Sequence, residues 1–186
     1  MNNGPVFRIG DTVVEPTIGV CRVQGIRKMV VDGAIEEYFI FQAPTAKVLV
    51  PKSQLTKRGI RRPMTKDDIK KVTTTLRMPV SPIRGDARTQ YLDYQETLKS
   101  GDPGRISKLL RNLYILDQSD DLKGKEKELM EQARKFLVDE ITFIKGTPKT
   151  QILNDINESL RQMYRKKTQK DREGSREKVT AAKKKK

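Results

Sequence analysis

The strongest constraint on the fold is an alternation of apolar and polar residues near the start of the chain, interrupted once by a proline and a glycine. The alternation covers residues 7–14, breaks at Pro16 and Gly19, and resumes over residues 20–26. A period of two on both sides of a short break predicts two antiparallel strands joined by a tight connection. The chain therefore opens with a small β-module.

Further strand signals follow this first pair. Asp32-Gly33 is a strong signal for a hairpin turn, and residues 38–41 and 47–51 are short apolar stretches, the second ended by a proline. Several short strands in so little chain predict a small, strongly curved sheet or open barrel, about the size of a Tudor or SH3 module. We assign this β-domain to residues 6–64.

From Thr65 onward, the spacing of apolar residues changes to that of helices. Thr65 is placed to cap a first helix, which prolines end at a linker over residues 79–85. Asp102-Pro103 starts a later helix with a capping aspartate and a proline at the first helical position. Helices joined by short turns over residues 65–164 predict a compact antiparallel bundle. The expected fold class is α+β, a Tudor/SH3-like β-domain followed by an all-helical domain.

The last part of the chain, residues 165–186, differs in composition from the rest. It carries eleven basic and three acidic side chains, and Val179 is its one large aliphatic residue. So little apolar surface cannot offset the entropy lost on ordering, so we expect a disordered basic tail. Two roles stay open for it, a solubilising segment or a nonspecific contact with nucleic-acid phosphates.

The inventory of reactive side chains argues against catalysis. The chain has no histidine and a single cysteine, Cys21, which excludes a zinc site and histidine-dependent mechanisms. No glycine-rich phosphate-binding motif is present. The acidic pairs Asp67-Asp68 and Asp120-Asp121 lie at expected helix starts or boundaries, where capping explains them. We expect no enzymatic activity, no cofactor and no metal.

The same features indicate where the protein works. No window is apolar enough to cross a membrane, and the first residues lack the features of a secretory signal. A lone cysteine suits a reducing compartment. The expected location is the cytoplasm, with no membrane partner.

The net charge of +15 predicts attraction to polyanions. Arg84 and Arg88 flank the linker and the second helix, and Arg105, Lys108 and Arg111 are spaced to share the polar side of the third. A charged run on a helix is commonly just its solvated face. Together with the basic tail, these residues predict a phosphate-contacting surface without a base-reading signature.

Several short motifs occur in an order and spacing that resemble a known family. They are Ile9-Gly10-Asp11-Thr12, Val48-Leu49-Val50-Pro51, Gly59-Ile60-Arg61, Ser100-Gly101-Asp102, Leu109-Leu110-Arg111-Asn112 and Ala133-Arg134. Over residues 6–160 the chain resembles the CarD/CdnL bacterial transcription regulators, whose first module is shared with the transcription-repair coupling factor. Each motif alone is short, and their common order carries the resemblance.

The resemblance implies a transcription regulator without enzymatic activity or cofactor. Its Tudor-like domain would bind the β subunit of RNA polymerase, and its helical domain would contact promoter DNA at the upstream edge of the transcription bubble, mostly through backbone and minor groove. It would thereby modulate open-complex stability as a monomer associated with the nucleoid. The positions implied for polymerase binding are Arg27, Lys28, Lys47 and Leu49.

Two positions depart from the family pattern. The family's wedge tryptophan aligns with Ala87 when the family's tyrosine is aligned with Tyr91, and an alanine cannot act as a wedge between bases. Where some members carry an arginine in the polymerase-facing strand, this chain has Leu49, with Lys47 two residues earlier. The expected DNA-binding residues are Arg84, Ala87, Arg88, Tyr91, Arg105, Lys108, Arg111 and Arg134.

Two other functions remain as alternatives. The protein could be a polymerase-binding adaptor without wedge activity, since it contains no tryptophan. It could also be a nonspecific nucleic-acid-binding protein that acts through its basic tail.

Overall fold

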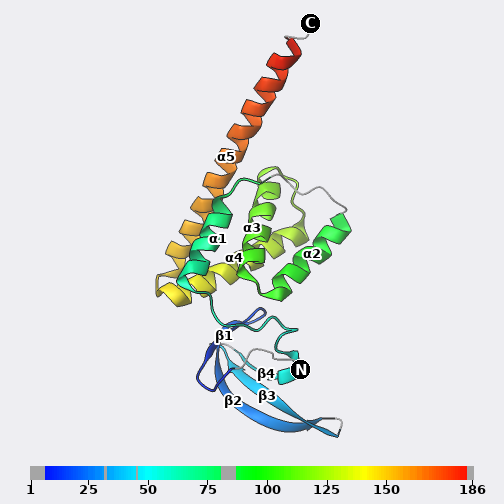
Figure 1. Ribbon diagram of the computed structural model, residues 1–186, viewed down its shortest axis with the longest axis vertical. Helices are drawn as coiled ribbons and strands as arrows, with labels where there is room; N and C mark the ends of the chain where they lie inside the picture. The colour runs from blue at the N-terminus through cyan, green and yellow to red at the C-terminus, as the bar shows by residue number, and fades with distance from the viewer. Residues whose placement is uncertain (1–6, 32, 45, 81–86, 184–186) are drawn as a thin grey trace.

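The computed structural model describes residues 7–31, 33–44, 46–80 and 87–183, with side chains at these positions except 87, 88 and 174–183. Within these ranges the chain forms a four-stranded antiparallel sheet followed by five α-helices (Figure 1). The predicted α+β class is therefore confirmed. Most of the predicted linker, residues 81–85, lies outside the described ranges.

The sheet has the strand order β1-β2-β3-β4, so each strand pairs with its neighbours in sequence. Its strands are β1 (Thr12–Glu15), β2 (Gly19–Val31), β3 (Ala34–Gln42) and β4 (Lys47–Pro51), and a short 3-10 turn, η1 (Lys52–Gln54), follows. The predicted first pair is confirmed, because Val14 lies opposite Val20. The predicted hairpin is also present: Val31 pairs with Ala34, and Gly33 takes the positive φ of 79° that such a turn requires.

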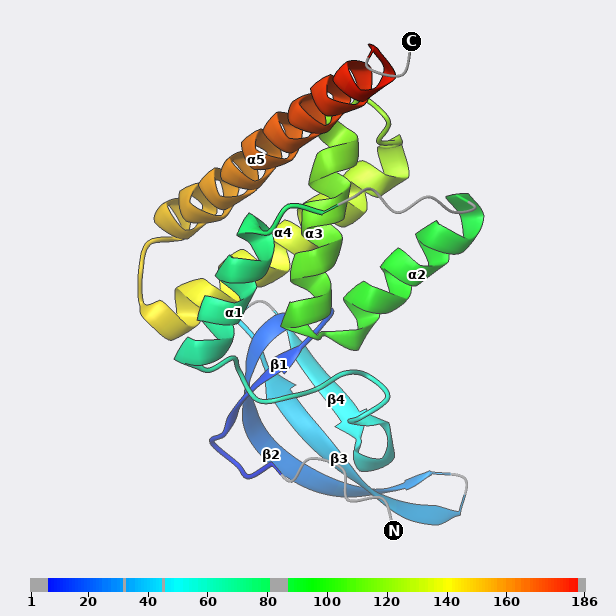
Figure 2. The same cartoon turned by 45° about the horizontal axis from the view of Figure 1, so that its top comes forward.

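The β-domain has its own small core on one face of the sheet. Phe39 and Phe41 stack with ring centroids 6.0 Å apart, and Phe7 meets Phe39 edge-on. The other buried members are Val13, Cys21, Val23, Ala43, Val50, Leu55 and Ile60. An antiparallel bridge from Val14 to Arg61 brings the end of the domain back to β1. Figure 2 shows β2 and β3 twisting strongly as they leave this core.

The helices are α1 (Lys66–Arg77), α2 (Ala87–Ser100), α3 (Pro103–Gln118), α4 (Gly124–Lys145) and α5 (Lys149–Lys183). Their boundaries follow local chemistry. Thr65 and Asp68 form a capping box at the start of α1, Asp102 accepts a hydrogen bond from the Arg105 N–H at the start of α3, and Gly146 ends α4 with a φ of 63°. A second core lies between the helices, centred on fully buried residues of which Leu110, Leu113, Leu137, Leu160 and Met163 are examples.

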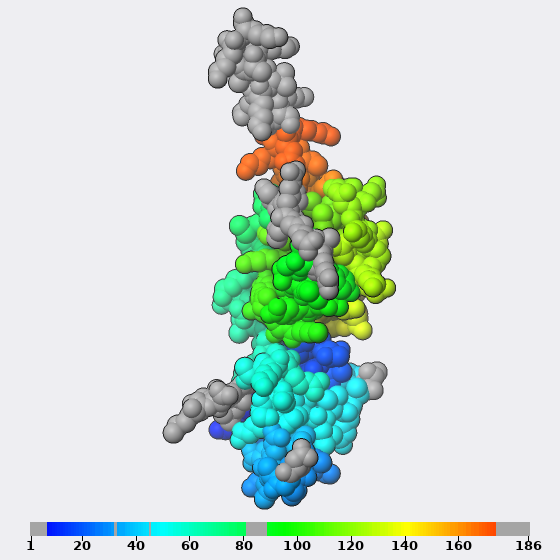
Figure 3. Space-filling view, turned by 90° about the vertical axis from the view of Figure 1, so that its right-hand side faces the viewer, coloured from blue at the N-terminus to red at the C-terminus, as the bar shows by residue number. Residues whose placement is uncertain are grey.

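Helix α5 is longer than the domain it packs on. Figures 1 and 3 show it passing the other helices at the end of the molecule opposite the sheet. The predicted disordered tail, residues 165–186, overlaps this projection: the backbone of α5 is helical to Lys183, and the side chains of residues 169–173 are all exposed. No helix in the described part of the chain has the length and apolar character needed to cross a membrane.

Candidate functional site

The outer face of the sheet gathers three of the four residues predicted to bind polymerase. Arg27 lies opposite Tyr38, and Leu49 lies opposite Ile40. Directly opposed residues share a face, and residues two apart along a strand do too, so Arg27, Leu49 and Lys47 all lie on the face away from the phenylalanine core. All three side chains are exposed.

Lys28 lies on the other face of the same hairpin. It is opposite Glu37 in the sheet, and Glu37 accepts a hydrogen bond of 2.7 Å from the Lys52 ammonium. That hydrogen bond and the charge of Lys52 lower the pKa of Glu37, with a smaller contribution from Lys28. The structure therefore does not bring Lys28 together with Arg27, Lys47 and Leu49.

The distal part of the β2–β3 hairpin exposes an apolar surface that the sequence prediction did not single out. Val30 is 71% exposed and Ile35 is 73% exposed, and Ile26, Met29 and Val31 are also exposed. Exposed apolar surface gathered on one element is typical of a protein-binding site. The alternation of apolar and polar residues predicts that these residues lie in strands. Only the structure shows that the hairpin is long enough to carry them beyond the β-domain core.

The expected DNA-facing residues of α3 divide into two groups. Arg105 and Lys108 are exposed. Arg111 is buried, and its Nη1 donates to the carbonyl oxygens of Thr75 at 3.2 Å and Met78 at 3.4 Å, at the end of α1. This burial lowers the pKa of Arg111. The expectation that Arg111 shares the exposed face of α3 is wrong, because α1 packs over that part of the helix.

The remaining expected DNA-binding residues are either partly buried or outside the described part of the chain. Arg134, on α4, has a side chain only 17% exposed and pairs with Glu131. Tyr91, on α2, is half-buried against the helical core, and its hydroxyl accepts a hydrogen bond from Gln95. Arg84 and the side chains of Ala87 and Arg88 lie outside the described residues. Of the expected set, Arg105 and Lys108 are the two whose described side chains are exposed.

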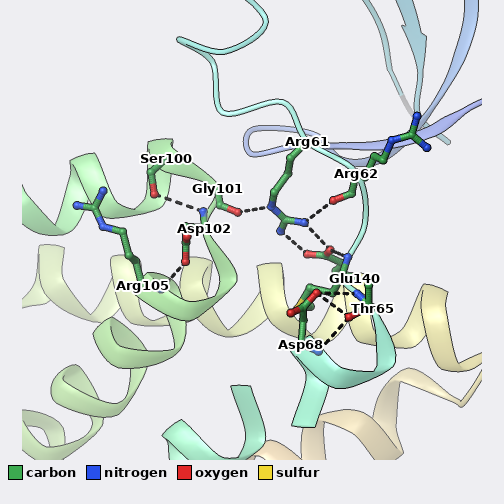
Figure 4. Close-up of polar contacts among 10 residues, drawn as sticks. Arg61, Arg62, Thr65, Asp68, Ser100, Gly101, Asp102, Arg105 and Glu140 are labelled. Carbon is green, nitrogen blue, oxygen red and sulfur yellow. Dashed lines mark hydrogen bonds and ion pairs between the residues drawn. The ribbon is translucent and has the colours of Figure 1, made fainter. Parts of the chain in front are cut away.

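A polar junction joins the two domains, and sequence reasoning missed it (Figure 4). Arg61, just after the β-domain core, donates to both carboxylate oxygens of Glu140 on α4, at 2.8 and 2.7 Å. The Met64 N–H donates to the same carboxylate at 2.7 Å, and the Arg61 Nε donates to the Gly101 carbonyl, also at 2.7 Å. Glu140 is only 1% exposed. The sequence did contain one sign of this junction: Glu140 is a charged residue at a position that helical spacing assigns to the apolar side of α4.

Backbone packs directly against backbone beside this junction. Gly59 and Gly101 both have positive φ, 66° and 65°. A Cβ atom on Gly59 would lie 2.5 Å from the Ser100 carbonyl oxygen, and one on Gly101 would lie 2.7 Å from the Pro16 ring. The turn between α2 and α3 therefore sits directly on the β-domain, against backbone at Gly59 and against the Pro16 ring at Gly101. The ion pair and this close contact together set the orientation of one domain on the other.

Comparison with known proteins gives matches for both halves of the chain. Residues 7–64 match the family description "CarD-like/TRCF RID domain", and residues 71–157 match "CarD, C-terminal domain". The chain belongs to the CarD family. A Bacillus subtilis (strain 168) relative named "Putative transcription factor YdeB" is 22% identical over 149 residues, which are 79% of this chain and 97% of the relative.

Membership of the CarD family makes this chain a transcription regulator with an RNA polymerase-interacting module at residues 7–64. The junction links the two family domains, because Arg61 belongs to the first match and Glu140 to the second. The CarD match ends at residue 157, whereas α5 continues to Lys183. The projecting part of α5 is thus outside the matched region.

Proposed function

We propose that this CarD-family protein docks on the β subunit of RNA polymerase through the outer face of its sheet and the exposed hairpin. Support comes from the arrangement of the surface. Arg27 and Lys47 supply positive charge on either side of the exposed Leu49, and the hairpin adds apolar area. An apolar centre with charged groups around it is the usual composition of a specific protein interface.

In the same proposal, the helical domain contacts promoter DNA near the upstream edge of the bubble and modulates open-complex stability. Arg105 and Lys108 on α3 are exposed and carry no competing ion pair among the described residues. Phosphate contacts of this kind give affinity without sequence preference, so the location must come from the polymerase. The protein acts by binding and catalyses no reaction.

The observation that carries the proposal is the Arg61–Glu140 junction. Because it holds α2 and α3 against the β-domain, docking of the sheet on polymerase also sets where Arg105 and Lys108 lie. Two weak contacts joined in this way gain from their effective concentration. A flexible connection would give the helical domain no defined position.

The direct test measures the lifetime of a promoter open complex with and without the protein. We expect the native chain to change the lifetime, and the double variant Arg27→Glu and Leu49→Glu to lose both this effect and polymerase capture. Lys57→Glu, at an exposed position in the turn that follows η1 rather than in a strand, should keep both. Ala87→Trp, which restores the wedge residue, is run beside them. If neither the native chain nor Ala87→Trp changes the lifetime, the proposed mechanism is refuted.

A polymerase-binding adaptor is the second candidate, favoured by the absence of tryptophan from the chain. It predicts polymerase capture that depends on Arg27 and Leu49 but an open-complex lifetime that the native chain leaves unchanged. If Ala87→Trp changes the open-complex lifetime and the native chain does not, the native protein is an adaptor. The tryptophan wedge would then be what it lacks for acting on the open complex.

A further inference from the structure

Helix α5 has a packed part and a projecting part, which divide at Thr168. Met163 is fully buried, Tyr164 meets Tyr114 edge-on with ring centroids 6.4 Å apart, and Thr168 is half-buried. From residue 169 to residue 173 every side chain is exposed. The helix therefore continues past its last packing contact among the described side chains, and stability of the domain does not explain the continuation.

The composition of the projecting part indicates what it can bind. Residues 169–186 carry eight basic and three acidic side chains, and their apolar side chains are Val179 and two alanines. At about 100° per residue, the described basic residues Lys170 and Arg172 lie about 200° apart around the helix axis, on different sides of it. Without an apolar stripe, such a helix has no seam for a coiled coil, no face for a membrane surface and no centre for a protein interface.

We propose that α5 beyond Thr168 is a second DNA-contacting element, which lies along the phosphate backbone of duplex DNA. Duplex DNA offers a continuous, sequence-independent array of negative charge, and a helix that is positive on several sides can meet it without a defined register. The helical residues 169–183 extend for about 22 Å at about 1.5 Å per residue, a length of about six base pairs.

The position of the element in the molecule predicts where on the promoter it binds. The sheet lies at one end of the molecule and the projecting part of α5 at the other (Figure 1). With the sheet docked on polymerase, α5 contacts duplex farther upstream than Arg105 and Lys108 do. This placement rests on the proposed function, whereas the affinity of α5 for free duplex does not.

The first test uses free duplex DNA and the salt dependence of its affinity for the full chain and for a chain ending at Thr168. The truncation keeps every side chain described as packed, so we expect an unchanged unfolding transition. We expect weaker binding and a salt slope smaller by about 0.9 for each phosphate that the truncated chain no longer neutralises. An unchanged slope overturns the proposal.

A matched pair of charge variants separates a local contact from a general effect of net charge. Lys170, Arg172 and Arg176 are changed to glutamine in one variant, and Lys66, Lys70 and Lys71, all on α1, are changed to glutamine in the other. Each variant loses three positive charges. We expect the α5 variant alone to reduce the salt slope. Equal losses in the two variants would refute a contact specific to α5.

The last test places the element on the promoter. Open-complex lifetime is measured with the full and truncated chains on templates whose upstream duplex is shortened in steps of about six base pairs. We expect the difference between the two chains to disappear once the upstream duplex is removed. If truncation weakens capture of polymerase without DNA, the partner is an acidic protein surface and the proposal is wrong. If neither chain changes any lifetime but the free-duplex slopes differ, the proposed function fails while α5 remains a DNA contact.

Discussion

Arg61 and Glu140 form a bidentate ion pair across the domain boundary, although they are 79 positions apart in sequence. The Arg61 guanidinium also lies over the Phe136 ring, 5.7 Å from its centroid. The arginine is therefore held by a carboxylate, a backbone carbonyl and an aromatic face at once. These contacts fix the orientation of the two domains in the folded protein. Substitutions at the junction are therefore expected to change both the stability of the protein and the orientation of its domains.

Replacing Arg61 with alanine should destabilise the protein by about 3 kcal/mol, because it leaves a buried carboxylate without its counter-charge. Chemical denaturation gives the free energy of unfolding, and small-angle scattering reports the orientation of the domains. Arg62→Ala is the matched control, since the Arg62 side chain is 69% exposed and pairs with Asp11 at 3.4 Å. We expect the control to cost less than about 1 kcal/mol. Similar losses in both variants would show that the junction contributes nothing beyond a surface pair.

Alanine at Gly59 or Gly101 should be more disruptive than alanine at Gly33. All three glycines have positive φ, so each substitution carries a backbone penalty of about 1 kcal/mol. A Cβ on Gly33 meets nothing within 4 Å, whereas those on Gly59 and Gly101 would come within 3 Å of the opposite domain. Melting temperatures of the three variants separate the backbone penalty, which all three share, from the clash with the opposite domain. Equal shifts for Gly33→Ala and Gly59→Ala would mean that the domains do not touch there in solution.

Much of the fold could be predicted because its signals are local. The capping box at Thr65, the Asp102-Pro103 helix start and the hairpin at Gly33 each depend on residues within a few positions of one another. The same holds for the separation into a β-domain and a helical domain, which follows from the change in apolar spacing.

The candidate site was less predictable because tertiary packing decides which basic residues remain exposed. Arg105, Lys108 and Arg111 are evenly spaced on α3, and nothing in their spacing shows that the end of α1 covers the last of them. Likewise, Arg61 belongs to a basic run after the β-domain, and its partner lies on a helix far along the chain. Periodicity identifies the element on which a residue lies, and contacts between distant elements decide its role.

Arg111 and the pair Arg105 and Lys108 should respond oppositely to substitution. Arg111→Ala removes two hydrogen bonds from a charged donor to the end of α1, so we expect about 2 kcal/mol of destabilisation and little change in the DNA affinity of the folded protein. The double variant Arg105→Ala and Lys108→Ala should keep its stability and lose DNA affinity. Unfolding curves and fluorescence anisotropy with a labelled duplex measure the two properties. If folded Arg111→Ala lost as much affinity for the duplex as the double variant, Arg111 would have to be counted among the residues that contact DNA.

Cys21 should be unreactive in the native protein well above neutral pH. Burial, with a smaller contribution from the charge of Glu15, raises its pKa to about 11, and the side chain is 2% exposed. Because the folded-state pKa lies above the unfolded value, the folded thiol keeps its proton in the pH range between the two values. Near pH 9, its thiolate fraction is therefore much lower than in the unfolded chain. Cys21 is the only cysteine of the chain, so iodoacetamide labelling reports on it alone. We expect slow labelling that denaturant accelerates strongly, and rapid labelling of the native protein at pH 8 would show that the β-domain core opens readily in solution.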